Sequence, residues 1–250
     1  MKQFNSDGVD IAFLDEGEGD PVLLIHGFAS NARVNWVDTH WVRTLLDDGR
    51  RVIAIDNRGH GASEKLYEPE AYGAPVMADD AARLLEHLGI PEADVIGYSM
   101  GARIAAFLAI RYPDRVRSVV FGGLAANMIR GVGGAEPIAQ ALEADSIDSV
   151  QDPMPRSFRA FAEATGSDLR ALAACMRSSR QKITEEELGR IGVPVLVVVG
   201  GSDDIAGSPE PLVAAIPGAR ALVIPGRDHM KTVGDKTFKK GVLEFLAERP

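Results

Sequence analysis

Short apolar runs recur along the chain, and amphipathic stretches separate them. The runs lie at residues 21–26, 51–56, 94–97, 116–121 and 194–199. Strands that are covered on both faces have this nearly continuous apolar pattern, as in a parallel sheet between helices. The sequence therefore predicts a parallel sheet enclosed between two layers of helices.

The stretches between the runs have the periodicity of helices. Helices are predicted at 41–48, 77–88, 102–112 and 237–248. In the first of them Trp41, Val42, Leu45 and Leu46 mark one face. Because strands and helices alternate, we expect right-handed crossover units. The predicted fold class is α/β, with a doubly wound, mostly parallel sheet of about eight strands flanked by helices.

The alternation stops between residues 124 and 191, where no strand pattern is found. Three short helices are expected there, at 136–145, 156–165 and 167–177. The prolines of Asp152-Pro-Met-Pro155 are expected to break the middle of the stretch. We interpret residues 1–123 and 192–250 as the core, and residues 124–191 as a helical lid inserted between two strands.

One further helix is predicted from Thr184. Thr184 and Glu187 have the spacing of a capping box, and Ile183 and Leu188 have the spacing of a hydrophobic staple. This helix would close the inserted segment before the next buried strand.

Composition and charge narrow the class of protein. The chain of 250 residues is 46% hydrophobic and 25% charged, with a formal net charge of −9, as in ordinary soluble domains. No basic cluster interleaved with aromatic residues is present, so no nucleic-acid partner is expected. The N-terminus lacks a signal peptide's apolar run, and no run could span a bilayer. We expect a cytoplasmic protein that acts on a small molecule, without membrane association; the oligomeric state stays open.

Cofactor and metal motifs are missing from the sequence. The single cysteine, Cys175, lies in an apolar helical pattern and is interpreted as a packing residue. There is no His-Glu-x-x-His motif and no phosphate-binding loop, and the glycines at 131–134 do not make a dinucleotide fingerprint. We therefore predict no metal and no cofactor.

The strongest chemical signal is Gly97-Tyr98-Ser99-Met100-Gly101. A predicted strand leads into this pentapeptide and a predicted helix leads out of it. That context turns a Gly-x-Ser-x-Gly pattern into a sharp strand-to-helix turn that exposes the serine hydroxyl. Ser99 is the predicted nucleophile.

Two more segments accompany this elbow, His26-Gly27-Phe28 and Asp56-Asn-Arg-Gly-His-Gly-Ala-Ser63. Together the three segments resemble the α/β-hydrolase family, over about residues 8–123 and 192–250. The resemblance implies a serine hydrolase in which Ser, an acid and His follow one another along the chain. It also implies an oxyanion hole built from the backbone N–H groups of Phe28 and Met100.

A serine needs a base to take its proton, and five histidines are available. His26 and His60 lie in glycine-containing turns and are interpreted as structural. His40 and His87 fall on amphipathic helices and are expected at the surface. His229 follows the strand pattern 220–224 in a loop before the last helix, where a catalytic base is expected. The family often has glycine before this histidine, whereas here the residue is Asp228.

The acid of the triad is predicted after the strand at 194–199. Gly200-Gly-Ser-Asp203 fits the family's Gly-x-x-Asp pattern and selects Asp203, with Asp204 as the alternative. Some relatives carry the acid one strand earlier, but here that strand ends in Phe121-Gly-Gly-Leu124 without a carboxylate. Asp203 would fix the imidazole tautomer of His229.

Pocket residues are predicted from the neighbours of these motifs. The candidates from the core are Phe28, Tyr98, Met100, Asn35 and Trp36, and those from the lid are Met128, Phe158 and Phe161. The helical spacing of Phe158 and Phe161 is equally compatible with packing inside the lid.

The favoured interpretation is a carboxylic-ester hydrolase for a small or medium acyl substrate, working through an acyl-enzyme. The same triad in similar folds also serves C–C bond hydrolysis, lactone opening, perhydrolysis and acyl transfer. A C–C hydrolase would need a basic pocket residue for a carboxylated substrate, for which Arg130, Arg156 and Arg177 are the candidates if they face inward. A hypothesis of another class is a ligand receptor that keeps the triad and turns over slowly.

Overall fold

A computed structural model describes residues 1–248 and contains one eight-stranded sheet. The last two residues of the predicted core, 249 and 250, lie outside the described residues. The strands are β1 (Lys2–Ser6), β2 (Val9–Glu16), β3 (Asp20–Ile25), β4 (Arg50–Ile55), β5 (Ala93–Tyr98), β6 (Val116–Gly122), β7 (Val195–Gly200) and β8 (Arg220–Ile224). Their order is β1-β2-β4-β3-β5-β6-β7-β8. All pairs from β4 to β8 are parallel, whereas β1 and β2 pair antiparallel, so the predicted mostly parallel sheet is confirmed.

The antiparallel edge, β1 and β2, has no counterpart among the apolar runs of the sequence. In β1 only Phe4 and Ser6 are buried, and the residues between and before them are exposed. A strand with one wet face alternates in this way, so a search for continuous apolar runs does not find it. Asp7 and Gly8, with φ values of 53° and 90°, form the tight connection of this hairpin, which is a common use of the Asp-Gly dipeptide.

Apolar side chains cover both faces of the central strands. In β3, Leu23 and Ile25 join the core on one face, and Val22 and Leu24 join the core on the other. The side chains of successive residues point to opposite faces, so a run without polar residues fills both cores at once. This double burial explains why these strands were predictable.

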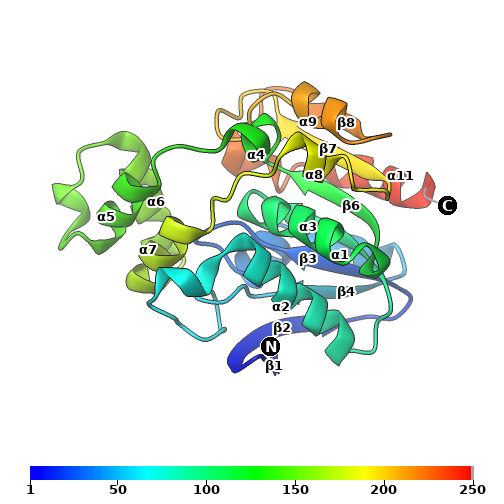
Figure 1. Ribbon diagram of the computed structural model, residues 1–250, viewed down its shortest axis with the longest axis horizontal. Coiled ribbons are helices and arrows are strands. Elements are labelled where there is room, and N and C mark those ends of the chain that lie inside the picture. The colour runs from blue at the N-terminus through cyan, green and yellow to red at the C-terminus, as the bar shows by residue number, and fades with distance from the viewer. Residues whose placement is uncertain (249–250) are drawn as a thin grey trace.

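Helices cover both faces of the sheet (Figure 1). One face carries α2 (Ala74–His87) and α3 (Met100–Arg111), and the other carries α1 (Trp41–Asp47) and α11 (Lys236–Glu248). All four helices were predicted, with bounds that differ by at most a few residues. The remaining elements outside the segment between β6 and β7 are short: η1 (Arg33–Val37), η2 (Pro69–Tyr72), η3 (Pro113–Arg115), α9 (Glu210–Ala215) and α10 (His229–Thr232).

Between β6 and β7 the chain forms helices and no strand of the sheet. They are α4 (Ala126–Arg130), α5 (Ala135–Glu143), η4 (Ile147–Ser149), α6 (Pro153–Ala164), α7 (Leu169–Ser178) and α8 (Glu185–Leu188). In Figure 1 the helices α5, α6 and α7 stand together as a group beyond one end of the sheet. They share a small apolar core of their own, which includes Ile138, Leu142, Leu172 and Met176.

In this inserted segment one prediction from the sequence was wrong and another was confirmed. Asp152-Pro-Met-Pro155 begins a helix: Pro153 is the first residue of α6, and the Asp152 side chain accepts a hydrogen bond from the backbone N–H of Met154. Proline is tolerated at that position because its missing N–H has no intrahelical partner there. The capping box of Thr184 and Glu187 is present as predicted at the start of α8.

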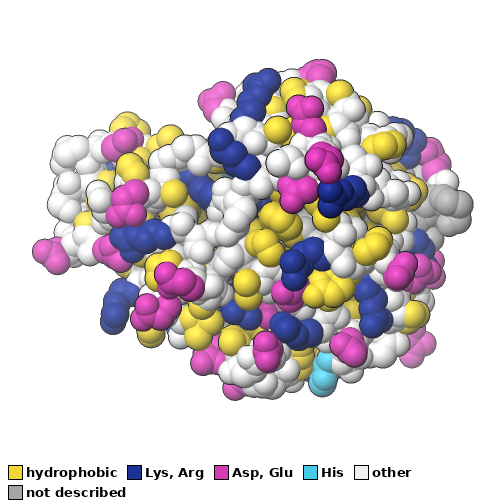
Figure 2. Space-filling model, viewed as in Figure 1, with side chains coloured by type: hydrophobic (Ala, Val, Ile, Leu, Met, Phe, Trp, Pro, Cys, Tyr) yellow, Lys and Arg dark blue, Asp and Glu magenta, His cyan; other side chains and the backbone are white. Residues whose placement is uncertain are grey.

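The surface carries mixed charge on the face shown in Figure 2, where basic and acidic side chains are interspersed. Within residues 1–248, no helix has the length and apolar character needed to cross a membrane.

Candidate active site

Ser99 lies in the sharp turn between β5 and α3. Its φ of 55° is in the region that non-glycine residues rarely adopt. The turn is held from both sides, because the N–H of Ser99 donates to the Gly122 carbonyl at 2.7 Å and its own carbonyl accepts from Ala102 at 3.0 Å. The strained conformation is thus imposed by the neighbouring strand and helix, as expected for a nucleophile elbow.

The two glycines of the elbow are required by close backbone approach. A Cβ atom at Gly97 would come within 2.2 Å of the Gly101 carbonyl oxygen. A Cβ atom at Gly101 would come within 2.0 Å of the Ile25 carbonyl oxygen. Both contacts are with backbone, so a side chain at either position would force α3 away from the sheet.

His229 brings an imidazole to the Ser99 hydroxyl. Its Nε2 lies 3.0 Å from Ser99 Oγ, and its Nδ1 lies 3.0 and 2.9 Å from the two carboxylate oxygens of Asp203. The Asp203 side chain is fully buried, and that of His229 is 13% exposed. Three side chains that follow β5, β7 and β8 therefore meet at the carboxyl edge of the sheet.

The loop that carries His229 is fixed at two points. Asp228 caps α10 by accepting a hydrogen bond from the backbone N–H of Lys231 at 2.8 Å. Its hydrogen bond with the Lys231 side chain, and after it this backbone hydrogen bond, lower the pKa of the Asp228 carboxyl. Its φ of −83° is ordinary for any residue, so the glycine common in relatives is not needed here. On the other side, the Tyr98 hydroxyl donates to the backbone carbonyl of His229.

Asp203 is held by the backbone that follows it. Its Oδ1 accepts hydrogen bonds from the N–H groups of Ile205 and Ala206, both at 2.9 Å. The alternative candidate, Asp204, is exposed and makes no contact with His229 among those found in residues 1–248. The geometry therefore selects Asp203 as the carboxylate that faces the imidazole.

The backbone N–H groups of Phe28 and Met100 flank the serine. Among residues 1–248 neither N–H donates to a protein acceptor, and both residues line the same cavity as Ser99. The loop before Phe28 is rigid, because Asn35 Oδ1 accepts from the Gly27 N–H at 3.1 Å and the ring of His26 binds the Gly27 carbonyl at 2.7 Å. Two residues that line one cavity with Ser99 and whose N–H groups have no protein acceptor are suited to form an oxyanion hole.

His26 and His60 stabilise this loop as buried, neutral rings. His26 Nε2 accepts from the Asn57 N–H at 3.0 Å, which assigns its proton to Nδ1, facing the Gly27 carbonyl. Burial lowers the pKa of His26 to about 4. Burial, with the nearby His26 as the second cause, lowers the pKa of His60 to about 3. The ring centroids are 5.2 Å apart, so the two rings have the structural role predicted for them.

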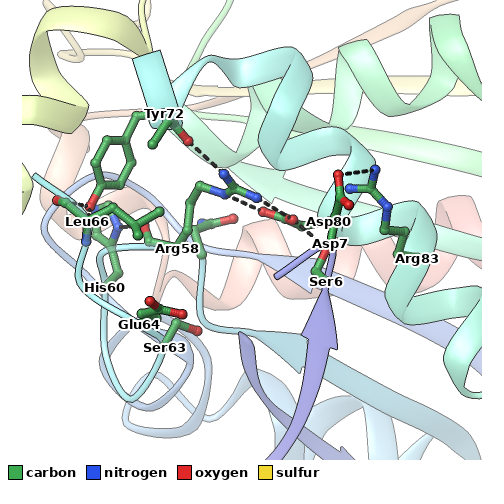
Figure 3. A network of polar contacts seen from close by, with 12 residues as sticks. Ser6, Asp7, Arg58, His60, Ser63, Glu64, Leu66, Tyr72, Asp80 and Arg83 are labelled. Carbon is green, nitrogen blue, oxygen red and sulfur yellow. Dashed lines mark hydrogen bonds and ion pairs between the residues drawn. The ribbon is translucent and has the colours of Figure 1, made fainter. Parts of the chain in front are cut away.

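The segment Asp56–Ser63 supports the loop after β3, which carries Phe28, through a buried polar network. Asp56 accepts from the N–H groups of Ala32 and Ala62, at 2.7 and 2.8 Å. Figure 3 shows Arg58 next to Asp80, which it binds through two hydrogen bonds of 2.7 Å. The residues drawn there tie β1, the turn after β4 and α2 together.

A cavity of about 350 Å³ opens beside the serine. That volume is within the range of small-molecule sites. Tyr98, Asn35, Phe158 and Phe161 line it, as the sequence predicted, together with Ser99 and His229. Phe28 lines it as well, and its ring meets that of Phe158 at 6.0 Å.

Two of the predicted pocket residues lie elsewhere. Trp36 is fully buried against Trp41 in the core on the α1 side of the sheet. Met128 is fully buried in the opposite core, on the α2 and α3 side. Both predictions were wrong because closeness to a motif along the chain does not decide which way a side chain points.

A second cavity, of about 40 Å³, also has Ser99 in its lining, together with two arginines that the sequence did not single out. Arg103 comes from α3, and Arg180 follows α7. The signal for Arg103 was a charged residue directly before seven consecutive apolar residues of the same helix, 104–110, which implies a buried charge.

The three arginines named as candidates for a carboxylate site on the condition that they face inward do not line either cavity. Arg130 is exposed. Arg156 binds the carbonyls of Ile147 and Val150, and Arg177 pairs with Glu136 and Glu143.

The remaining candidates are structural or lie at the surface. His40 and His87 are exposed. Cys175 is fully buried, and burial raises the pKa of its thiol to about 12, which disfavours the reactive thiolate. Within the described part of the chain, no three His, Cys, Asp or Glu side chains come together as a metal site would require.

The site as a whole has the parts of nucleophilic catalysis. A hydroxyl, an imidazole and a buried carboxylate form one hydrogen-bonded chain, and two unpaired N–H groups lie beside the hydroxyl. This geometry is suited to attack on a carbonyl carbon and to stabilising the oxyanion that forms.

Comparisons with known proteins agree with the fold and the motifs. The family described as alpha/beta hydrolase fold matches residues 20–131. The chain is 31% identical over 252 residues to a protein of Mycobacterium tuberculosis that carries the name "Putative non-heme bromoperoxidase BpoC", covering 89% of this chain and 91% of that protein. A hydrolase from Pseudomonas aeruginosa has a crystal structure that superposes with a TM-score of 0.81 at 25% identity, covering 98% of this chain and 97% of that one.

A more local match is to the 2-hydroxymuconate semialdehyde hydrolase of a Pseudomonas species. The two chains are 37% identical over 137 residues, which is 55% of this chain and 45% of that enzyme. The matched names include more than one chemistry, so they identify a family and not a substrate. On the evidence of fold, motifs and relatives together, this chain belongs to the α/β-hydrolase fold family.

Proposed function

We propose that this protein is a serine hydrolase that cleaves carboxylic esters through an acyl-enzyme on Ser99. The observation that carries the proposal is the continuous chain from Ser99 Oγ to His229 Nε2 at 3.0 Å and from His229 Nδ1 to Asp203 at 2.9 Å. Hydrolases among its relatives support the general class of reaction.

In the first half-reaction, Ser99 Oγ attacks the ester carbonyl carbon while its proton passes to His229 Nε2. The tetrahedral intermediate collapses as the C–O bond to the alcohol breaks, and His229 returns the proton to the departing oxygen. In the second half, His229 takes a proton from water, whose oxygen attacks the acyl-enzyme, and the Ser99 Oγ–acyl bond then breaks. The proton returns to Ser99, and the products are an alcohol and a carboxylic acid.

Asp203 holds the Nδ1–H tautomer of His229 and stabilises the imidazolium that forms in each step. The N–H groups of Phe28 and Met100 donate to the oxyanion, and each such donor contributes on the order of 10²–10³ in rate. Because both donors are backbone groups, the Phe28 and Met100 side chains are not themselves needed for this role.

The larger cavity supports a small or medium organic group next to the reacting carbon. Its wall combines aromatic rings from both parts of the chain, Phe28 from the core and Phe158 and Phe161 from the inserted helices. We interpret residues 124–191 as a lid over the core formed by residues 1–123 and 192–250, because these aromatic residues cover the serine from that side.

A panel of p-nitrophenyl esters with acyl chains of two to eight carbons tests the proposal. We expect turnover of the short and medium esters, which Ser99→Ala abolishes, and we expect a fluorophosphonate probe to label Ser99. Ligand binding without turnover would instead identify a receptor. Turnover of a C–C, lactone or acyl-transfer substrate in place of all esters would replace the ester assignment while keeping the triad.

A further inference from the structure

The small cavity beside Ser99 has an unusual lining for its size. Its wall contains the apolar residues Leu124, Val132 and Met176, yet two arginines, Arg103 and Arg180, also line it. Cationic side chains are rarely placed among apolar residues unless an anion accompanies them. The question is which group neutralises them.

Arg103 is bound only by neutral acceptors. Its side chain donates to the backbone carbonyls of Asn127 and Met128 at 3.3 and 3.2 Å, and to that of Gln181. The residue is 2% exposed. These bonds use three of its five N–H groups and connect α3 to both ends of the inserted segment, but they leave its positive charge without a counter-charge.

Arg180 is also held by carbonyls. Its Nη1 donates to the carbonyl of Val132 at 3.2 Å and to that of Gly133, and its guanidinium lies 5.9 Å from the centroid of the Phe158 ring. No ion pair or hydrogen bond to a carboxylate of residues 1–248 is found for Arg103 or Arg180. By contrast Arg177, three residues earlier, pairs with two glutamates outside the cavity.

The missing counter-charge is not explained by a shortage of acidic residues, since the chain has 36 Asp and Glu residues against 27 Lys and Arg. Burial lowers the pKa of Arg103 to about 10, with the charge of Arg180 as the second cause, and burial also lowers the pKa of Arg180. Both side chains stay protonated at neutral pH, so two like charges face one cavity. An anion placed there would relieve both the desolvation and the repulsion.

The size of the cavity limits that anion. A volume of about 40 Å³ accommodates roughly three water molecules, which is close to the bulk of one carboxylate group. Ser99, Phe28, Phe158 and Ile205 line both this cavity and the larger one. A substrate whose reacting carbonyl lies at Ser99 can therefore extend a large group into one cavity and a small anionic end into the other.

We propose that the preferred ester substrates carry a carboxylate a short distance from the carbonyl that Ser99 attacks, and that this carboxylate binds Arg180 in the small cavity, with Arg103 adding positive charge behind it. The inference rests on the proposed function, because it names the substrate class of the same site. Arginine is suited to this role because its planar guanidinium matches a carboxylate.

A matched pair of esters tests the proposal in the intact protein. The p-nitrophenyl monoester of succinic acid carries a carboxylate, and p-nitrophenyl 4-methylpentanoate is its neutral counterpart of the same shape. We expect kcat/KM to be higher for the succinate ester in the unaltered protein. The ratio of the two values is the readout, because general effects of a substitution on folding or on the triad cancel in it.

Three variants test whether Arg180 causes the preference for the succinate ester. In Arg180→Gln we expect the ratio to fall roughly 10- to 100-fold, as expected for loss of a charge-assisted hydrogen bond. Arg180→Lys keeps the charge and should retain most of the preference. Arg130→Gln removes an exposed arginine of the same inserted segment and should leave the ratio unchanged.

The outcomes separate the two proposals. Loss of the preference in Arg180→Gln, with recovery in Arg180→Lys, supports the carboxylate site. No preference in the unaltered protein, or a preference that Arg180→Gln leaves intact, overturns it while esterase activity stands. If neither ester is cleaved in a Ser99-dependent way, the proposed function fails, and weaker inhibition by free succinate in Arg180→Gln, measured on whichever reaction the protein does catalyse, still tests the carboxylate site.

Discussion

The sheet and the inserted helices supply different residues to the active-site cavity. The two sets of residues are also held in place by different interactions. Ser99, Asp203 and His229 all come from loops of the sheet, and backbone hydrogen bonds fix each loop. Phe158, Phe161 and Arg180 come from the segment between β6 and β7, which packs around its own small apolar core. The comparison implies that the sheet determines whether a bond is cleaved, and that the inserted helices determine which substrates are accepted.

The largest expected effect comes from the buried acid of the sheet. Asp203→Asn should lower kcat about 10⁴-fold on every substrate, because an amide no longer holds the Nδ1–H tautomer of His229. Steady-state kinetics on a short and a long ester measure whether the loss is equal. Asp204→Asn, at the exposed neighbour, is the control and should change kcat less than about threefold, in line with other surface substitutions. An equal loss in both variants would contradict the assignment of Asp203.

The second expected effect is a loss of folding stability at low pH. It arises from buried histidines of the core, since the sequence has no histidine between residues 124 and 191. His26 and His60 have pKa values of about 4 and about 3 when folded, whereas an unfolded histidine titrates near 6.5. As the pH falls below about 6.5, these two imidazoles therefore bind protons in the unfolded chain while they stay neutral in the folded chain. Stability is full above that pH and should drop by about 4 kcal/mol between pH 7 and pH 5.

Urea unfolding at several pH values measures this slope. His60→Gln should reduce the slope by about half, because one of two buried rings is removed. His87→Gln, at an exposed histidine, should leave it unchanged. If the slope in His60→Gln equals that of the unaltered protein, acid does not act through these rings.

A smaller effect is expected from the hydroxyl that positions the base. Tyr98→Phe removes the hydrogen bond to the His229 carbonyl and should cost about 1 kcal/mol of stability, with kcat reduced several-fold. Tyr112→Phe is a matched control, because its hydroxyl binds Asp79 at the far end of α3. That variant should lose similar stability and no kcat; equal kcat losses in the two would argue against a positioning role for Tyr98.

The smallest effect should come from the inserted helices, and it should depend on the substrate. Phe161→Ala removes one wall of the larger cavity. We expect KM for a medium-chain ester to rise several-fold and kcat/KM for the acetate ester to change little, because only the longer chain reaches that wall. Met154→Ala, exposed on the same helix, is the control. A uniform loss on both esters would break the division between sheet and insertion.

Much of the sheet was predictable because strands that are buried on both faces have continuous apolar runs in the sequence. The central strands and the helices α1, α2, α3 and α11 follow from apolar runs and periodicity. The hairpin of β1 and β2 was not found, since its burial depends on which face meets the core. The start of α6 at Pro153 was taken for a break because proline both ends and begins helices.

The candidate site divides in the same way. Ser99, Asp203 and His229 lie where strand ends must meet, so a fixed order along the chain was enough to place them together. Trp36 and Met128 were misplaced, and Arg180 was missed, because the direction of a side chain in a loop or short helix depends on tertiary packing. Arg103 left a trace in the sequence, as a charge directly before a run of apolar residues, that a search for buried charges would have found.

The position of Arg103 has a mechanical consequence. It lies one helical turn beyond the nucleophile, its own N–H donating to the Ser99 carbonyl at 3.3 Å, and its side chain holds the chain where the inserted segment leaves the core and where it returns. Both crossings between the core and the inserted segment are therefore tied to the helix that begins next to the reactive serine. Helices of another length or shape could be exchanged between these two crossings while Arg103 and its three carbonyl partners keep their places.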